Sequence, residues 1–307
     1  MARIIENIER VIVDKRREIE LVLTALLCRG HILIEDVPGV GKTSIASALA
    51  KSLDCSFKRI QFTPDIMPAD ITGFSVYNPK TGDFEYRRGA ILSHVVLADE
   101  INRTSPKTQS SLLEAMEENQ VTVDGETYRI GEPFIVIATQ NPVDYLGTYP
   151  LPEAQLDRFF MRISLGYPSL GEEMRMVSRF TGENPLADLT PVVSGGDIIA
   201  LQEQVERVYV EPVVNEYIVS LVRHTRENAF LALGASPRAS INLYRAAQAR
   251  ALYGGRDFVM PDDVVAMAPH VLTHRLVLSQ EARLKKLTQA DMVTMAVEAA
   301  KVPITRR

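Results

Sequence analysis

The chain of 307 residues has no tryptophan, only two cysteines, and few aromatic residues, which make up 7% of it. Cys28 and Cys55 do not have the spacing of metal ligands, and so few cysteines argue against a disulfide scaffold and favour a reducing compartment. No charge-free apolar run approaches the length of a membrane span, and residues 1–20 carry charges throughout, unlike a signal peptide. We therefore expect a cytoplasmic protein with no membrane span.

The chain also has no excess of positive charge. It contains 39 acidic and 34 basic residues, for a formal net charge of -5, so no global positive field would draw it to nucleic acid or anionic lipid. With 46% hydrophobic residues the composition is that of an ordinary globular protein. Because 307 residues exceed what one core usually organises, the length favours two units.

The first half of the chain alternates short apolar runs with helical patterns. Such runs are typical of a parallel sheet covered on both faces, and they predict five strands. Between the first two runs, Ile45, Leu49 and Leu53 recur at every fourth residue, as on an apolar helix face. The five runs are residues 31–35, 57–62, 95–99, 134–138 and 160–165.

Two segments, 74–91 and 120–130, interrupt this alternation and are expected to be insertions on the sheet domain. In the second, Asp124-Gly125 between alternating residues predicts a hairpin turn. After about residue 168 the strand runs stop and helical patterns take over, with Pro237 and Pro261 at first-turn positions. We expect an α/β domain over 1–168 and a helical domain over 169–307. The helical patterns cover 171–181, 196–208, 212–228, 238–252, 261–275 and 289–301.

The sequence EDVPGVGKT, residues 35–43, follows the first predicted strand and precedes a predicted helix. This placement is that of a phosphate-binding loop, in which backbone N–H groups and the positive helix end face an anion. Lys42 would reach the β and γ phosphates, and the Thr43 hydroxyl would ligate Mg²⁺. The general pattern has glycine where this chain has Asp36. We expect nucleotide contacts from Asp36, Pro38, Gly39, Val40, Gly41, Lys42, Thr43 and Ser44.

Polar side chains end two further strands. Asp99 and Glu100 follow an apolar run, where Asp99 could hold magnesium and Glu100 could polarise the water that attacks the γ-phosphate. Asn141 ends another run and could bind that water or the γ-phosphate, with Thr139 or Gln140 as alternatives. Taken alone, an acidic pair at a strand end is often merely solvated, and Asn-Pro is an ordinary turn.

Taken in order, these motifs resemble the AAA+ ATPases, and DEINRTSPKTQSSLLEAMEENQVTVDG at 99–125 is similar to the MoxR group within them. The resemblance covers about residue 10 to beyond residue 280, and the form EDVPGVGKT is familiar in this group. It implies a P-loop NTPase with a five-stranded parallel sheet in the order 5-1-4-3-2, flanked by helices, and a C-terminal all-helical lid. It also implies that 74–91 is the helix-2 insert and 120–130 the pre-sensor hairpin.

The resemblance also implies roles for individual residues. Lys42 and Thr43 match the Walker A pair, Asp99 and Glu100 the Walker B pair, and Asn141 the sensor 1 position. Arg158 in LDRF resembles the arginine finger, which reaches the γ-phosphate of a neighbouring subunit, and Arg238 in SPR resembles sensor 2, which acts in its own subunit. Ile12 and Val13 lie where relatives pack on adenine. Without the family, each arginine could equally be an ordinary surface or helix-start residue.

The implied function is Mg²⁺-dependent ATP hydrolysis by a ring, expected to be a hexamer. Such a ring would remodel or activate protein complexes as a chaperone, with von Willebrand factor A domain proteins as candidate clients. One alternative is a nucleic-acid motor, which the mostly acidic or neutral 120–130 disfavours, although Lys80, Arg87 and Arg88 leave it open. Another is a nucleotide-dependent switch with little turnover.

Two features have no clear place in this scheme. Arg103 lies close enough to the Walker B strand to face the nucleotide or a subunit interface, and we expect an interface. The five histidines form no HExxH, and only His270 and His274 have the i, i+4 spacing of a metal pair, with no acidic partner nearby. We do not expect a metal site there.

Overall fold

The computed structural model describes residues 1–37, 39–141, 147–179 and 185–303. The chain divides into two compact units. The first contains Met1–Leu151 and Ile163–Ile199, and the second contains Pro152–Arg162 and Ala200–Arg307. Among the described residues, no helix is both long and apolar enough to cross a membrane.

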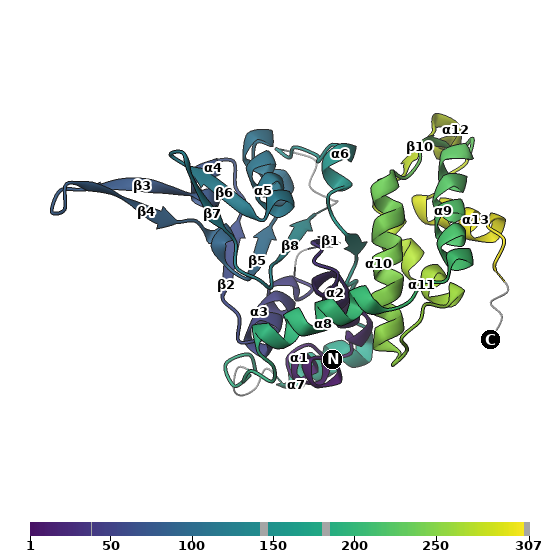
Figure 1. The fold of residues 1–307 in the computed structure, drawn as a ribbon, viewed down its shortest axis with the longest axis horizontal. Helices are drawn as coiled ribbons and strands as arrows, with labels where there is room; N and C mark the ends of the chain where they lie inside the picture. Colours follow the sequence, from purple (N-terminus) through teal and green to yellow (C-terminus); the bar gives the residue numbers. More distant parts are fainter. Residues whose placement is uncertain (38, 142–146, 180–184, 304–307) are drawn as a thin grey trace. The chain divides into compact units, whose positions relative to one another are not determined.

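The central element is a five-stranded sheet whose strands lie in the order β2-β5-β8-β1-β9 (Figure 1). Counted along the chain as five sheet strands, this is the order that the family resemblance implies, and both the strand number and the order are confirmed. The pairs β2–β5, β5–β8 and β1–β8 are parallel, and β5 is buried along its whole length. The strands are β1 (Ile32–Glu35), β2 (Phe57–Gln61), β5 (Val95–Asp99), β8 (Ile135–Gln140) and β9 (Met161–Ile163).

Helix α3 (Lys42–Ser52) links β1 to β2 and packs against α1 and β5. The predicted apolar face is buried, because Ile45, Leu49 and the following Leu53 are each 1% exposed or less. The remaining helices of this unit are α1 (Ala2–Glu9), α2 (Arg16–Leu27), α4 (Pro68–Thr72), α5 (Pro106–Glu118) and α7 (Leu170–Arg179), and α8 (Gly195–Arg207) leads into the second unit.

Both inserted segments are antiparallel hairpins. The predicted turn at Asp124-Gly125 joins β6 (Gln120–Val123) to β7 (Glu126–Arg129), and both turn residues have positive φ, 52° and 84°, as a type I′ hairpin turn requires. The other hairpin, β3 (Gly73–Asn78) and β4 (Asp83–Arg88), extends away from the sheet (Figure 1). The rings of Tyr86 and Tyr128 stack with centroids 4.0 Å apart, so the two hairpins contact each other.

The second unit is helical, as predicted. Pro237 and Pro261 occupy the first turns of α10 and α11, and the pattern expected to run to residue 275 ends as a 3₁₀ turn, η3 (Thr273–Arg275). The expectation that strands stop after residue 168 is wrong in one place, because β10 (Leu231–Leu233) pairs with β11 (Val277–Leu278). Runs of two and three residues are too short to show a strand period. The helices are α9 (Pro212–Glu227), α10 (Pro237–Tyr253), α11 (Pro261–Leu272), α12 (Gln280–Leu284) and α13 (Gln289–Ala299).

The division into units differs from the expected single boundary at residue 168. The segment before α8 belongs to the first unit because the Val192 N–H donates to the Ser52 carbonyl, 3.0 Å, and the Asn7 side chain donates to the Thr190 carbonyl, 3.0 Å. Lys51 Nζ also donates to the Leu186 carbonyl, 2.7 Å. These partners are more than 130 residues apart in sequence, so no local pattern could reveal them.

His31, directly before β1, should make the free energy of unfolding depend on pH. Its Nδ1 accepts from the Val136 N–H, 3.0 Å, so Nε2 carries the proton and donates to the Met116 carbonyl, 3.0 Å. Burial lowers the pKa of His31 from its ordinary 6.5 to about 4. Because the unfolded chain takes up this proton at higher pH than the folded chain, the free energy of unfolding should fall by about 3 kcal/mol as the pH drops from 6.5 to 4.

Urea unfolding of the wild type and of His31→Gln across this pH range would measure the effect. The variant cannot titrate at this position, so its stability should depend less steeply on pH. Parallel curves for the two proteins would contradict the assignment.

Candidate functional site

The segment between β1 and α3 curls around its two glycines. Gly39 and Gly41 have φ of 88° and 93°, and Gly41 is the residue from which α3 starts. A Cβ added to either glycine would meet no atom within 4 Å, so nothing crowds this side of the turn in the described part of the chain. Pro38, one of the expected nucleotide contacts, lies outside the described residues. The conformation fits a phosphate cradle, since successive N–H groups and the start of a helix can face one anion.

Lys42 and Thr43 form the first turn of α3. The Lys42 side chain turns back to the loop, where Nζ donates to the Asp36 carbonyl at 2.9 Å. Thr43 is exposed, while Ser44 and Val40 are half-buried. The cation and the hydroxyl expected for phosphate and Mg²⁺ therefore lie at consecutive positions beside the turn.

Asp36 departs from the glycine of the general loop pattern, and its side chain has a structural partner. The carboxylate accepts from the backbone N–H groups of Leu165 and Gly166, the latter at 3.2 Å, and from the Ser164 hydroxyl at 3.2 Å. These donors follow β9, so the side chain joins the start of the loop to the chain beyond the edge strand. Of the Asp36 atoms, the backbone carbonyl is the one that meets Lys42.

The carboxyl ends of β1, β5 and β8 meet at one edge of the sheet, because these strands are parallel neighbours. Thr139, near the end of β8, connects this edge: its hydroxyl donates to Asp99 Oδ1, 2.6 Å, and accepts from the Glu100 N–H, 2.9 Å. The Asp36 N–H donates to the Gln140 carbonyl, 3.2 Å. The loop, the acidic pair and the end of β8 are thus brought together, as the sequence predicts for a phosphate site.

Glu100 has an unusual backbone conformation for a residue other than glycine, with φ of 59° and ψ of 49°. A left-handed residue of this kind costs about 1–2 kcal/mol and is frequent at functional sites. Its carboxylate accepts from Gln61 Nε2, 3.1 Å, and pairs with Arg103 Nε, 3.1 Å. Arg103, which we expected at a subunit interface, is therefore a partner of Glu100 within the chain.

Arg59 and Gln61 on β2 are site residues that the sequence analysis missed. Arg59 Nη2 pairs with Asp99 Oδ2, 2.7 Å, and donates to Gln61 Oε1, 2.6 Å. The register places Gln61 opposite Asp99. The signal was the spacing of Arg59 and Gln61, two residues apart in the run 57–62 and so on one face of a strand, which becomes informative only once β2 is known to lie beside β5.

The other expected site residues are spread over both units. In the first unit, Asn141 is buried just after β8, and Ile12 and Val13 lie between α1 and α2, buried and half-buried. In the second unit, Arg158 is half-buried and follows α6 (Glu153–Leu156), and Arg238 is exposed at the second position of α10.

Among the described residues, no group of three or more His, Cys, Asp or Glu side chains could hold a metal ion. His274 is buried, and its Nε2 contacts the Phe159 carbonyl at 3.2 Å, as a core histidine would. Cys28 is buried and Cys55 half-buried. The Thr43 hydroxyl and the Asp99 carboxylate are hard oxygen donors of the kind that Mg²⁺ prefers, and such ions keep phosphate and water ligands besides.

Comparison with known proteins gives the family. The family model described as "ATPase family associated with various cellular activities (AAA)" matches residues 31–161, and the model of the AAA lid domain matches residues 223–295. YeaC of Bacillus subtilis is 53% identical over 306 residues, which cover 100% of this chain and 96% of YeaC. Chaperone MoxR1 of Mycobacterium tuberculosis is 39% identical over 312 residues, 99% of this chain and 82% of MoxR1.

A solved structure agrees with these matches. The crystal structure of a Cytophaga hutchinsonii protein assigned as an ATPase has a TM-score of 0.92 and 39% identity, over 99% of this chain and 94% of that one. These relatives are covered over 82% to 96% of their own lengths, and the family models match both the sheet domain and the lid. The chain belongs to the MoxR family of AAA+ ATPases.

Proposed function

We propose that this chain binds ATP with Mg²⁺ at the carboxyl edge of the sheet and hydrolyses it to ADP and phosphate. The observation that carries the proposal is that the glycine turn at 39–41 follows β1 at the same edge of the sheet as Asp99 and Glu100, with β8 between them contacting both sides. ATP needs N–H donors and a cation for its phosphates, oxygen ligands for its metal, and a base beside its γ-phosphate. This edge offers each of them on neighbouring elements.

In this proposal the triphosphate lies in the turn, with the Lys42 ammonium on the β and γ phosphates. Thr43 and Asp99 would hold Mg²⁺, which when bound neutralises charge on the phosphate oxygens. Glu100 takes a proton from the attacking water, and Asn141 orients that water or the γ-phosphate. Ile12 and Val13 would contact the adenine. Arg59, which pairs with Asp99, is a further positive charge at this carboxylate.

The arginines of the second unit complete the proposed reaction. Arg238 would contact the phosphates in its own subunit, and Arg158 would reach the γ-phosphate of the next subunit. A guanidinium that serves a neighbouring site makes turnover depend on assembly, so we propose a ring, expected to be a hexamer. Because MoxR1 is named a chaperone, we propose that the ring remodels or activates protein complexes, with von Willebrand factor A domain proteins as candidate clients.

Loss of the Lys42 ammonium tests the phosphate site. Lys42→Ala should weaken ATP binding by about 10- to 100-fold, since a charge-assisted contact to phosphate contributes about 1.5–3 kcal/mol. Titration with a fluorescent ATP analogue would measure the affinity. Lys51→Ala is the matched control, because Lys51 lies on the same helix and donates instead to the Leu186 carbonyl. Equal affinities for wild type and Lys42→Ala would remove the loop from the proposed site.

A further inference from the structure

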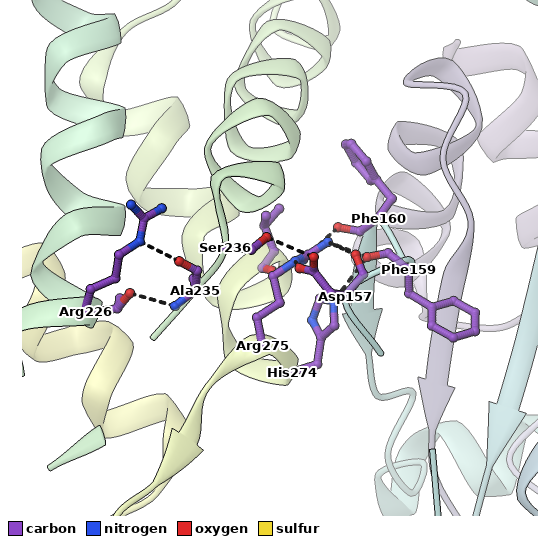
Figure 2. A network of polar contacts seen from close by, with 10 residues as sticks. Asp157, Phe159, Phe160, Arg226, Ala235, Ser236, His274 and Arg275 are labelled. Carbon is purple, nitrogen blue, oxygen red and sulfur yellow. Dashed lines mark hydrogen bonds and ion pairs between the residues drawn. The ribbon is translucent and has the colours of Figure 1, made fainter. Parts of the chain in front are cut away.

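Arg275, the last residue of η3, is a buried cation whose side chain is 1% exposed. A guanidinium has five N–H donors, and here the donated bonds number five (Figure 2). Nε donates to Asp157 Oδ1, 2.8 Å. The backbone acceptors are the carbonyls of Asp157 at 3.2 Å, Phe159 at 2.5 Å, Phe160 at 3.3 Å, and Val271. Burial lowers the pKa of Arg275 to about 10, so the group stays charged at neutral pH.

Apart from the Val271 carbonyl on α11, the acceptors on this guanidinium lie on both sides of Arg158. Asp157 precedes it, and the buried residues Phe159 and Phe160, 0% and 4% exposed, follow it. His274, next to Arg275, adds a contact from Nε2 to the Phe159 carbonyl, 3.2 Å. The backbone that carries Arg158 is therefore bound to the end of α11 through η3.

The second oxygen of Asp157 leads to Arg238. Oδ2 accepts from the Ser236 hydroxyl, 2.9 Å, and Ser236 is the residue before α10, two positions ahead of Arg238. The neighbouring Ala235 is bound to α9, because its carbonyl accepts from Arg226 Nε, 2.8 Å, and its N–H donates to Thr225 Oγ1, 3.0 Å (Figure 2). One carboxylate thus links the segment of Arg158 to the start of the helix that carries Arg238.

We propose that Arg275, Asp157 and Ser236 form a clamp that positions Arg158. The inference rests on the proposed function, in which Arg158 serves the neighbouring subunit. All three clamp residues belong to the second unit, which also contains Pro152–Arg162. The contacts of the clamp therefore lie within one unit.

The clamp should hold the backbone around Arg158 firmly because its contacts are numerous and largely buried. Lysine has three donors and cannot replace the five bonds of Arg275, and a neutral Asn at position 157 loses the ion pair while keeping its shape. Breaking a buried pair leaves the remaining charge without compensation, so the backbone around Arg158 would rearrange. Arg275 and Asp157 act through Arg158, and we assign them no direct contact with nucleotide.

Mixing variant subunits with Glu100→Gln subunits distinguishes a misplaced Arg158 from general damage to the fold of the variant. Asp157→Asn should lower the rate of ATP turnover about 10- to 100-fold while leaving ATP affinity within about twofold, since its own phosphate loop is intact. Adding Glu100→Gln subunits, which cannot turn over ATP but supply an intact finger, should restore part of the rate. Ser236→Ala, a milder change, should show the same pattern with a loss of about 3- to 10-fold.

Asp263→Asn is the matched control. Asp263 is a buried acid in the same unit, paired with Arg256 at 2.7 Å through both oxygens, and its loss damages the helical unit without touching the clamp. If Asp263→Asn lowers the rate of ATP turnover at all, adding Glu100→Gln subunits should not restore that rate. Thermal unfolding of each variant would show that the proteins compared are folded. If Asp157→Asn does not fold, the mixing experiment is done with Ser236→Ala instead.

Arg158→Ala, measured in parallel, distinguishes failure of the proposed site shared between subunits from failure of the clamp. If Arg158→Ala turns over ATP like the wild type, the proposed shared site fails. If Arg158→Ala is inactive while Asp157→Asn and Ser236→Ala keep the wild-type rate, the clamp alone is overturned. A loss in the clamp variants that mixing does not restore also overturns it, because the defect would then lie in the subunit's own site.

Discussion

Arg158→Ala is expected to bind ATP as tightly as the wild type and to turn it over about 10³- to 10⁵-fold more slowly. The reason is electrostatic: the side chain would contribute nothing to its own site and would stabilise the charge that develops on the neighbouring γ-phosphate. Phosphate release under saturating ATP, compared with binding of a fluorescent ATP analogue, would separate the two effects. Arg223→Ala is the control, since Arg223 is exposed in the same unit and pairs with Glu227.

Assembly gives this prediction a second readout. Arg158→Ala keeps a complete phosphate loop, and Glu100→Gln keeps a complete finger, so a mixture of the two should recover part of the rate although each is inactive alone. Specific activity of the wild type should also rise with protein concentration as rings form. A mixture as inactive as its components, together with a flat concentration profile, would contradict a site shared between subunits.

Glu100→Gln is expected to lose turnover by about 10²- to 10⁴-fold and to retain ATP binding. Glutamine has nearly the shape of glutamate but cannot take a proton from water, so the loss isolates the base from the rest of the site. Glu114→Gln, an exposed acid on α5, is the matched control. Phosphate release and nucleotide binding would be measured on the same samples.

The same comparison decides between hydrolysis and a nucleotide-dependent switch. A wild type as inactive as Glu100→Gln at every protein concentration would favour the switch. A wild type that is far more active than the variant would instead identify Glu100 as part of the hydrolytic machinery.

Much of the fold could be predicted because its signals are local. The five runs of the sheet, the α3 face with Ile45 and Leu49, and the Asp124-Gly125 turn are all visible within windows of a few residues. The order of the strands came from the family resemblance and not from any of these windows. The ribbon pair β10–β11 was missed because so few residues carry no period.

The candidate site was predicted as a set of strand ends, and its finer contacts were not. Thr139 was considered as a substitute for Asn141, yet its hydroxyl joins Asp99 to the Glu100 backbone. Arg59 became relevant only through the neighbouring strand, and Arg275 lies 118 residues from its partner Asp157. A single sequence does not reveal which distant groups share a buried contact, and these three contacts depend on such pairing.

The carboxylate of Asp36 has a consequence for how the loop tolerates a polyanion. Its charge is shared among two amides and a hydroxyl of the 164–166 segment, so the acid nearest the glycine turn is already solvated by the protein itself. Under the proposed function, repulsion of an incoming triphosphate would thereby be reduced at the one loop position where the chain departs from the general pattern. Replacing Asp36 with glycine, the residue of the general pattern, would leave those amide donors without an acceptor. We therefore expect the glycine variant to be less stable than the wild type.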